Sequence, residues 1–140
     1  MKNPQEVVQR MLEQDHFSQW MELKVNSIAE GTSTVSMFVK QEMLNGFGVI
    51  HGGVLFSLAD SAFAFACNSR DNLTLALDAQ INFIKKAVRG DLLTASVEEV
   101  HSGKTTGVYE VKIRNQASEL IAVFRGTAYR TGKSLFENKD

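Results

Sequence analysis

The stretch NGFGVIHGGVLFSLADSAFAFACNS, residues 45–69, decides how the rest of the chain must be arranged. Its first part holds Asn45-Gly46 and Gly48, which predict a turn-rich loop. From about residue 52 to residue 68 nearly every position is apolar or small, which predicts a long helix. Because these residues cover almost the whole circumference, we expect a helix that is enclosed by protein.

The segments around this helix follow a different period. Alternation of apolar and polar residues predicts strands at about 23–25, 34–39, 73–83, 91–100, 105–115 and 119–130. The short gaps between the last strands leave no room for crossover helices, so these strands must pair in antiparallel fashion. The sequence therefore predicts an α+β fold in which an antiparallel sheet of about five to six strands wraps around one long central helix.

The remaining features predict one domain spanning residues 1–140. No repeat or linker divides the chain, and 44% of its 140 residues are hydrophobic, enough for a core. Asn3-Pro4 has the pattern of an N-cap followed by proline, which predicts a short surface helix over about 4–16.

Charge and cysteine content exclude several classes of protein. Fifteen basic residues face sixteen acidic ones, so we expect neither a nucleic-acid partner nor a membrane partner. The first residues are too charged for a secretory signal, and the single cysteine, Cys67, is expected to be a small core residue. The three histidines are too scattered to indicate a metal site. These features predict a cytoplasmic protein.

The pair Gly52-Gly53 lies where the long helix is expected to begin. The first amide groups of a helix have no partner within it, and the helix dipole is positive there. Glycines let the oxygen of another molecule come close to those amides, which is how a developing oxyanion is held. The alternative is that the glycines only permit a tight turn.

Asp60 is the one carboxylate within the helix. Helical spacing places it on one stripe with Ser57, Ser61 and Ala64, the least apolar line of the helix. Burial among the surrounding apolar residues should raise its pKa, which suits a general base or a nucleophile. The alternative is a structural carboxylate that caps a neighbouring backbone group.

Spacing leads from these two features to an oligomer. Gly52 and Asp60 are eight residues apart, roughly 12 Å along a helix. One helix therefore cannot bring both groups to one reacting carbon, which must lie within about 3.5 Å of its attacker. If both groups act together, Asp60 comes from a second, antiparallel copy of the helix, and the active form is at least a dimer.

At this point the chain resembles the hotdog-fold thioesterases of the phenylacetic-acid-degradation (PaaI) type. The residues that carry the resemblance are an Asn, then HGG, then an Asp within the helix that continues LADSAFAFACNS. The segments INFIKKAVRGDLLTASVEEVHSGKTTGVYEV (81–111) and LIAVFRGTAYR (120–130) extend it, so that it covers about residues 20–130.

The resemblance implies a site and a reaction. Asp60 matches the general base or nucleophile of acyl-CoA thioester hydrolysis, and Gly52, with Gly53 beside it, matches the glycine whose amide polarises the thioester carbonyl. His51 and Asn45 match polar positions that orient the thioester and the water. The resemblance further implies homodimers paired into tetramers, no cofactor, and substrates similar to phenylacetyl-CoA.

Several residues have two possible roles. His51 alone is typical of a residue that bonds the backbone where a helix begins, and Asn45-Gly46 is usually a turn. Lys104, in the predicted hairpin 101–107, is a candidate contact for coenzyme A phosphates, as a point charge for an anion. The pattern favours it over the other basic candidates, which are Lys85, Lys86, Arg89 and Arg125. Asp78 would compete with Asp60 if it pointed into the site.

One departure from the family pattern and two alternative functions remain. Members of the family often have a proline after the long strand, where this chain has Lys85-Lys86-Ala87, so a local loop difference is expected. The alternative functions are an enoyl-thioester hydratase or dehydratase on the same fold, and a non-catalytic acyl-CoA-binding domain. Within the hydrolase hypothesis, direct attack by water and a transient Asp60 anhydride both stay open.

Overall fold

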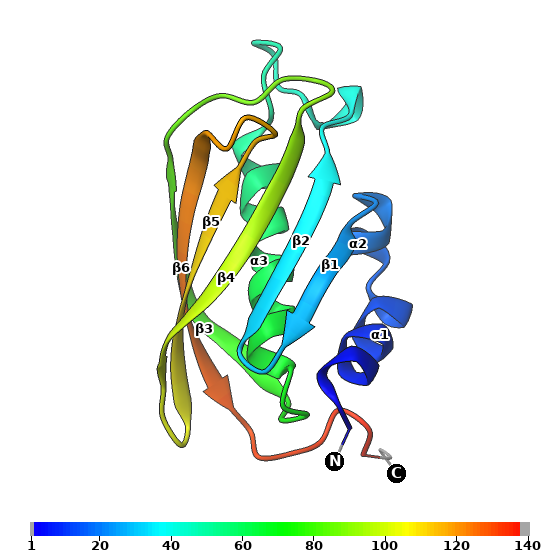
Figure 1. Ribbon diagram of the computed structural model, residues 1–140, viewed down its shortest axis with the longest axis vertical. Helices are drawn as coiled ribbons and strands as arrows, with labels where there is room; N and C mark the ends of the chain where they lie inside the picture. Colours follow the sequence, from blue (N-terminus) through cyan, green and yellow to red (C-terminus); the bar gives the residue numbers. More distant parts are fainter. Residues whose placement is uncertain (1, 138–140) are drawn as a thin grey trace.

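The computed structural model describes residues 2–137. Six strands form one antiparallel sheet in the order β1-β2-β4-β5-β6-β3, and the sheet curves around helix α3 (Figure 1). The first strand is longer than predicted, because its polar middle and a bulge between Val25 and Ser27 hide the alternation. The strands are β1 (Lys24–Ala29), β2 (Thr32–Phe38), β3 (Thr74–Phe83), β4 (Leu92–Ser102), β5 (Thr106–Arg114) and β6 (Leu120–Arg130).

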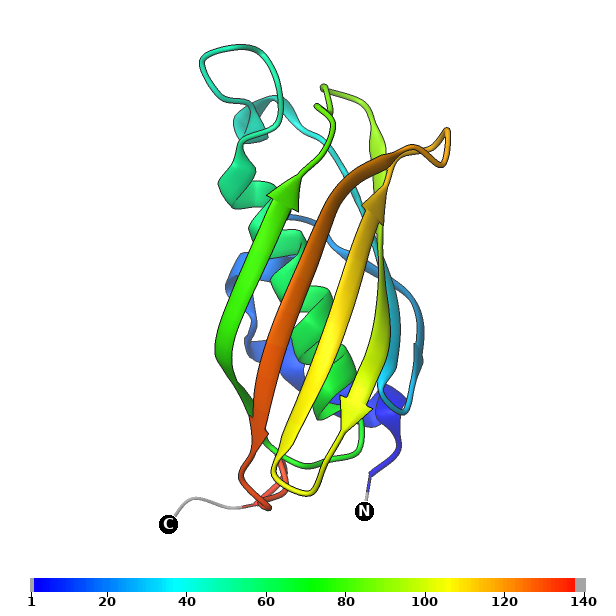
Figure 2. The same ribbon diagram turned by 90° about the vertical axis from the view of Figure 1, so that its left-hand side faces the viewer.

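Helix α3 (Gly52–Asn68) has the bounds that the sequence predicts, and Figure 2 shows it lying along one face of the sheet. Phe63 is fully buried at the centre, with its ring 5.6 Å from the rings of Tyr109 and Phe124. A Cβ atom at Gly126 of β6 would come within 2.8 Å of the Phe63 ring, so this close approach of helix and sheet requires glycine.

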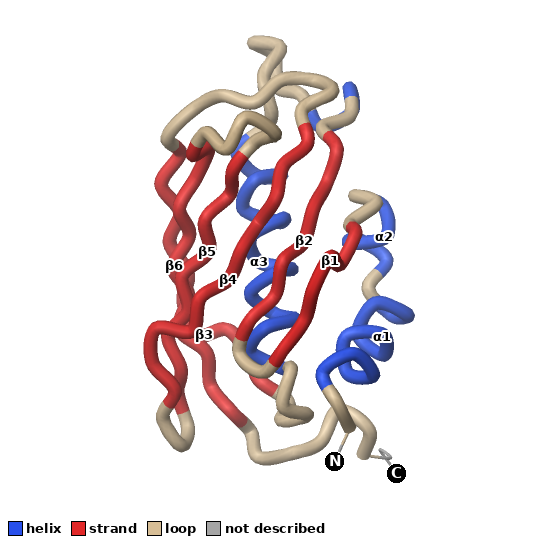
Figure 3. The backbone as a smooth tube through the Cα atoms, viewed as in Figure 1, coloured by secondary structure: helices blue, strands red, loops and turns tan. Residues whose placement is uncertain are grey.

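The N-terminal helix ends earlier than predicted. Instead of one helix over 4–16, the chain forms α1 (Pro4–Gln14) and a separate short helix, α2 (His16–Trp20). Asp15 lies between them and caps α2, because its carboxylate accepts hydrogen bonds from the Ser18 amide (3.0 Å) and the Ser18 hydroxyl (2.6 Å). Figure 3 shows both helices beside β1, at one edge of the sheet.

Strand β3 forms the other edge of the sheet, and it pairs with β6 on one side only. No described segment pairs with the outer edge of this strand, and nearly all its residues are exposed. They include large apolar side chains, with Leu77 61% exposed and Phe83 57% exposed. An unpaired, apolar edge strand is a template for pairing with another chain.

None of the described helices is long and apolar enough to cross a membrane.

Candidate active site

The loop before α3 is held in shape by Asn45. Its side-chain oxygen accepts hydrogen bonds from the amides of Phe47 (2.9 Å) and Val49 (3.4 Å), so the predicted turn is confirmed. The side-chain NH₂ of Asn45 makes no hydrogen bond with a described residue, and it remains a free donor. Asn45 therefore both shapes the loop and keeps in it a donor without a described partner.

His51 is the N-cap of α3. Its Nδ1 atom accepts a hydrogen bond from the Gly53 amide at 2.9 Å, which confirms the structural role that the sequence allowed for it. Because Nδ1 accepts, the proton of the neutral imidazole lies on Nε2, which stays available as a donor.

This cap makes the backbone amides of the two glycines different. The Gly53 amide is already paired with His51, whereas the Gly52 amide finds no acceptor among residues 2–137. Gly52 therefore supplies the free amide at the positive end of the helix dipole.

A pocket of about 420 Å³ opens beside this amide. It is lined by Val49, Ile50, Gly52, Leu55, Phe83, Ile84, Lys85 and Lys86. The Phe83 ring lies over Gly52 so closely that a Cβ there would be 2.9 Å from the ring tip. A substrate carbonyl could meet the Gly52 amide from this pocket only because no side chain stands between them.

Asp60 lies on the one stripe of α3 that the rest of the chain leaves open. The expectation that this carboxylate is buried is wrong for the described chain: the sheet covers the opposite side of the helix, and Asp60 is exposed together with Gly53. Among the described residues none donates a hydrogen bond or an ion pair to it, so it does not serve as a cap. Its pKa is raised, as predicted, by partial desolvation on the helix and secondarily by the nearby Asp15 carboxylate.

Asp15 provides a test of that electrostatic coupling. We expect Asp15→Asn to move the acid limb of the kcat–pH profile to lower pH, because removing a neighbouring negative charge makes the Asp60 carboxylate easier to ionise. Asparagine is an equally good N-cap, so α2 should persist. The profile is measured with a thioester substrate. An acid limb that stays in place or moves to higher pH would contradict this coupling.

Two other predicted residues lie away from the start of α3. Lys104 is in the β4–β5 connection, at the end of the sheet opposite to that at which α3 begins (Figure 1). Asp78 pairs in register with Thr127, between two core-facing residues of β6, so it faces away from α3. Within one chain the structure therefore places Asn45 in the loop before α3, and His51 and Gly52 at the start of that helix, and it leaves Asp60 about two turns further along the helix.

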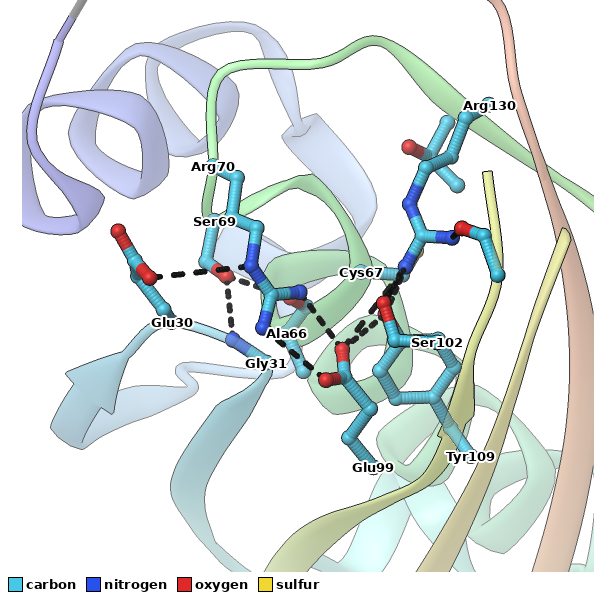
Figure 4. Close-up of polar contacts among 12 residues, drawn as sticks. Glu30, Gly31, Ala66, Cys67, Ser69, Arg70, Glu99, Ser102, Tyr109 and Arg130 are labelled. Atoms are coloured by element: carbon cyan, nitrogen blue, oxygen red, sulfur yellow. Dashed lines mark hydrogen bonds and ion pairs between the residues drawn. The ribbon is translucent and has the colours of Figure 1, made fainter. Parts of the chain in front are cut away.

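A second polar cluster, which no sequence pattern predicted, lies near the other end of α3 (Figure 4). Arg70 donates two hydrogen bonds to Glu99, at 2.7 and 3.0 Å, and Tyr109 donates a third at 2.7 Å. Arg130 donates to the Tyr109 hydroxyl (3.2 Å) and to the Gly103 carbonyl (2.6 Å). These groups satisfy one another, so the cluster ties helix and strands together instead of presenting reactive atoms.

The cluster predicts an effect on stability. Glu99→Gln should lower the free energy of unfolding by about 1–3 kcal/mol near neutral pH, because it weakens charge-assisted bonds from Arg70. Arg70 lowers the pKa of Glu99. The stabilisation is therefore complete above the unfolded-state pKa and is lost as the pH falls through the lower folded-state pKa. Urea unfolding at several pH values, with Glu98→Gln as control, measures this; a difference that persists in acid would contradict it.

Cys67, at the end of α3, is buried and has the core role that the sequence predicts. Burial raises the pKa of its thiol to about 12. A thiol with so high a pKa is not an active nucleophile.

Comparison with known proteins identifies the family of this chain. Residues 47–122 match the model of the family described as the thioesterase superfamily, which is more than half of the chain. The chain belongs to the thioesterase superfamily. The predicted class of enzyme, a thioester hydrolase, is thereby confirmed.

Individual relatives of this thioesterase place it within the superfamily. It is 42% identical to the acyl-coenzyme A thioesterase PaaI of Escherichia coli K12 over 89% of each chain. The solved structure of the E. coli PaaI protein, from the phenylacetic acid degradation operon, superposes with a TM-score of 0.91 and 40% identity, over 94% of this chain and 95% of that one. The resemblance to the PaaI type and the hotdog fold are both confirmed.

Another relative was solved with a ligand. A hypothetical thioesterase from Streptococcus pneumoniae TIGR4, with coenzyme A, superposes with a TM-score of 0.82 at 30% identity, over 88% of this chain and 98% of that one. Proteins with the architecture of this thioesterase therefore include one that binds coenzyme A.

Proposed function

We propose that this thioesterase hydrolyses acyl-CoA thioesters to the free acid and coenzyme A, at sites built from two copies of the chain. The observation that carries the proposal is the state of two groups on α3. The Gly52 amide has no acceptor and the Asp60 carboxylate has no donor among the described residues. Both lie on open parts of one helix, too far apart to act together in the same chain.

The outer edge of β3 supports a second copy as the missing partner. Pairing of β3 with the same strand of a twofold-related chain would satisfy its free backbone groups and cover Leu77 and Phe83. The two α3 helices would then lie side by side and antiparallel, so that each Gly52 faces the other chain's Asp60. We extend the proposal to a homodimer at minimum, paired into a tetramer, in the cytoplasm.

The proposed mechanism assigns one role to each group. The Gly52 amide binds the thioester oxygen and stabilises the negative charge that develops there, with Gly53 beside it as the capped second residue of the helix. The Nε2–H of His51 and the NH₂ of Asn45 orient the thioester and the attacking water.

Asp60 of the other chain either takes a proton from that water or attacks the carbonyl itself, forming an anhydride that water then hydrolyses. In both routes the carbon–sulfur bond breaks and the thiolate of coenzyme A leaves and is protonated. Partial desolvation of Asp60, which raises its pKa, would be more complete in the dimer. Single-turnover hydrolysis in oxygen-18 water separates the routes, because only the anhydride route puts label into Asp60.

The proposed substrates are aromatic, phenylacetyl-type acyl-CoA thioesters. The similarity to the PaaI thioesterase supports this class, and so does the aromatic ring of Phe83 in the pocket beside Gly52.

A thiol-release assay over a panel of acyl-CoA thioesters tests the function. We expect release of free coenzyme A, with the highest kcat/KM for phenylacetyl-CoA and its hydroxylated relatives. Absorbance of an enoyl-CoA is followed in parallel. Consumption of the enoyl group without release of thiol would show a hydratase and overturn the proposal.

A further inference from the structure

The pocket beside Gly52 has a cationic rim. Lys85 and Lys86 follow directly after β3, and both line the pocket that contains Gly52 and Phe83. In this segment the chain departs from the family pattern, which often has a proline after the long strand, where this chain has Lys85-Lys86-Ala87.

The backbone holds these lysines in place. The Lys85 amide donates to the Ile121 carbonyl at 3.1 Å, so the connection is tied to β6 immediately after β3 ends. Two residues further on, the Ala87 carbonyl accepts from the amide of Ile50 at 2.8 Å, in the loop that leads into α3. Lys86 lies between these two anchors, so its position relative to Gly52 is fixed by the fold.

The two lysines differ in how their charge is used. Lys85 forms an ion pair with Glu119, which neutralises it locally. No described carboxylate forms an ion pair with Lys86, and no described group accepts a hydrogen bond from its amine. An exposed ammonium group without a partner, at the rim of a pocket, is available to an anion from outside the protein.

We propose that Lys86 binds a phosphate group of the coenzyme A part of the substrate as the acyl thioester lies against Gly52. The inference rests on the proposed function, and it names the charged contact that the site offers to that substrate. Within one protomer Lys86 is favoured over Lys104, because the β4–β5 connection of the same chain lies at the end opposite to the start of α3 (Figure 2).

A matched pair of substrates isolates the contact. Phenylacetyl-CoA and the phenylacetyl thioester of N-acetylcysteamine share the acyl group and the thioester, but only the first has phosphates. We expect Lys86→Gln to raise KM for phenylacetyl-CoA by about two- to fivefold, and Lys86→Glu by about tenfold or more, as for an exposed ion pair. Both variants should leave kcat for phenylacetyl-CoA and kcat/KM for the short thioester unchanged.

Two further lysine variants complete the design. Lys24→Gln removes the same charge from β1, at the other edge of the sheet, and should change neither substrate's parameters. Lys104→Gln tests the alternative directly. The inference would be overturned if Lys86→Gln changed the kinetics of both substrates equally or of neither. It would also be overturned if Lys104→Gln, and not Lys86→Gln, had an effect that depended on the phosphates.

A third substrate identifies the phosphate. The substrate is phenylacetyl-3′-dephospho-CoA, which lacks only the 3′-phosphate. If Lys86 binds the 3′-phosphate, Lys86→Gln should leave the kinetics of this substrate unchanged, as for the short thioester. If Lys86 binds the diphosphate, Lys86→Gln should raise the KM of this substrate as much as that of phenylacetyl-CoA. Failure of the function itself looks different, because the wild-type protein would then hydrolyse none of these thioesters.

Discussion

Replacing Asp60 with asparagine is expected to lower kcat for phenylacetyl-CoA by at least about 10²-fold. Asparagine has nearly the same shape, but it can neither accept a proton from water nor attack a carbonyl. The side chain makes no hydrogen bond with a described residue, so the free energy of unfolding should change by no more than about 0.5 kcal/mol. Thiol release gives kcat, and thermal unfolding checks that the fold is intact.

The matched control is Asp78→Asn. It removes a carboxylate from β3, on the face of the sheet that lies away from α3, and it should keep kcat within about threefold of the wild type. If Asp60→Asn is as active as this control, Asp60 has no part in the chemistry.

The second large effect is expected from Gly52→Val, which should lower kcat/KM by about 10²-fold. A Cβ at this position would lie 2.9 Å from the tip of the Phe83 ring, so the branched side chain must occupy the space through which the thioester oxygen reaches the amide. Loss of one oxyanion donor typically costs that much. Steady-state kinetics with phenylacetyl-CoA measure the effect.

Gly46→Ala is the control for this variant. It adds a methyl group in the loop before α3, where nothing but its chain neighbours lies within 4 Å, and it should leave kcat/KM within about threefold of the wild type. Normal kinetics in Gly52→Val would show that the amide is reached from elsewhere or is not used.

The elements of the fold could be predicted because local pattern and final structure agree. The unbroken apolar run after Gly52-Gly53 indicates one buried helix, and the alternation in β3 indicates one strand; both elements form close to the predicted bounds. The break at Asp15 was missed because the apolar positions of α1 gave no sign that a side-chain cap would start a new helix there. Strand order was not predictable from local pattern, since it depends on which strands pair across the sheet.

The candidate site was predictable only in part. The residue types at Gly52 and Asp60, and the distance between them, follow from the sequence. The sequence could not show that His51 pairs with the Gly53 amide and leaves that of Gly52 free. That outcome depends on a side-chain rotamer. The cluster around Glu99 was also missed, because Arg70 and Arg130 come to it from distant parts of the chain.

Lys86 shows why a basic residue near a motif is a weak predictor of binding. Nothing in the local sequence favours Lys86 over Lys104. Only the topology shows that Lys86 lies beside the start of α3, and that Lys104 of the same chain lies at the far end of the sheet.

Co-expression of Asp60→Asn with Gly52→Val tests most directly whether each active site draws on two chains. Random pairing would make half of the dimers mixed, and each mixed dimer would hold one site with an intact amide and an intact carboxylate. The mixture should therefore recover about one quarter of wild-type kcat, although each variant alone is nearly inactive. Activity no greater than the sum of the two variants measured separately would mean that both groups act within one chain or not together at all.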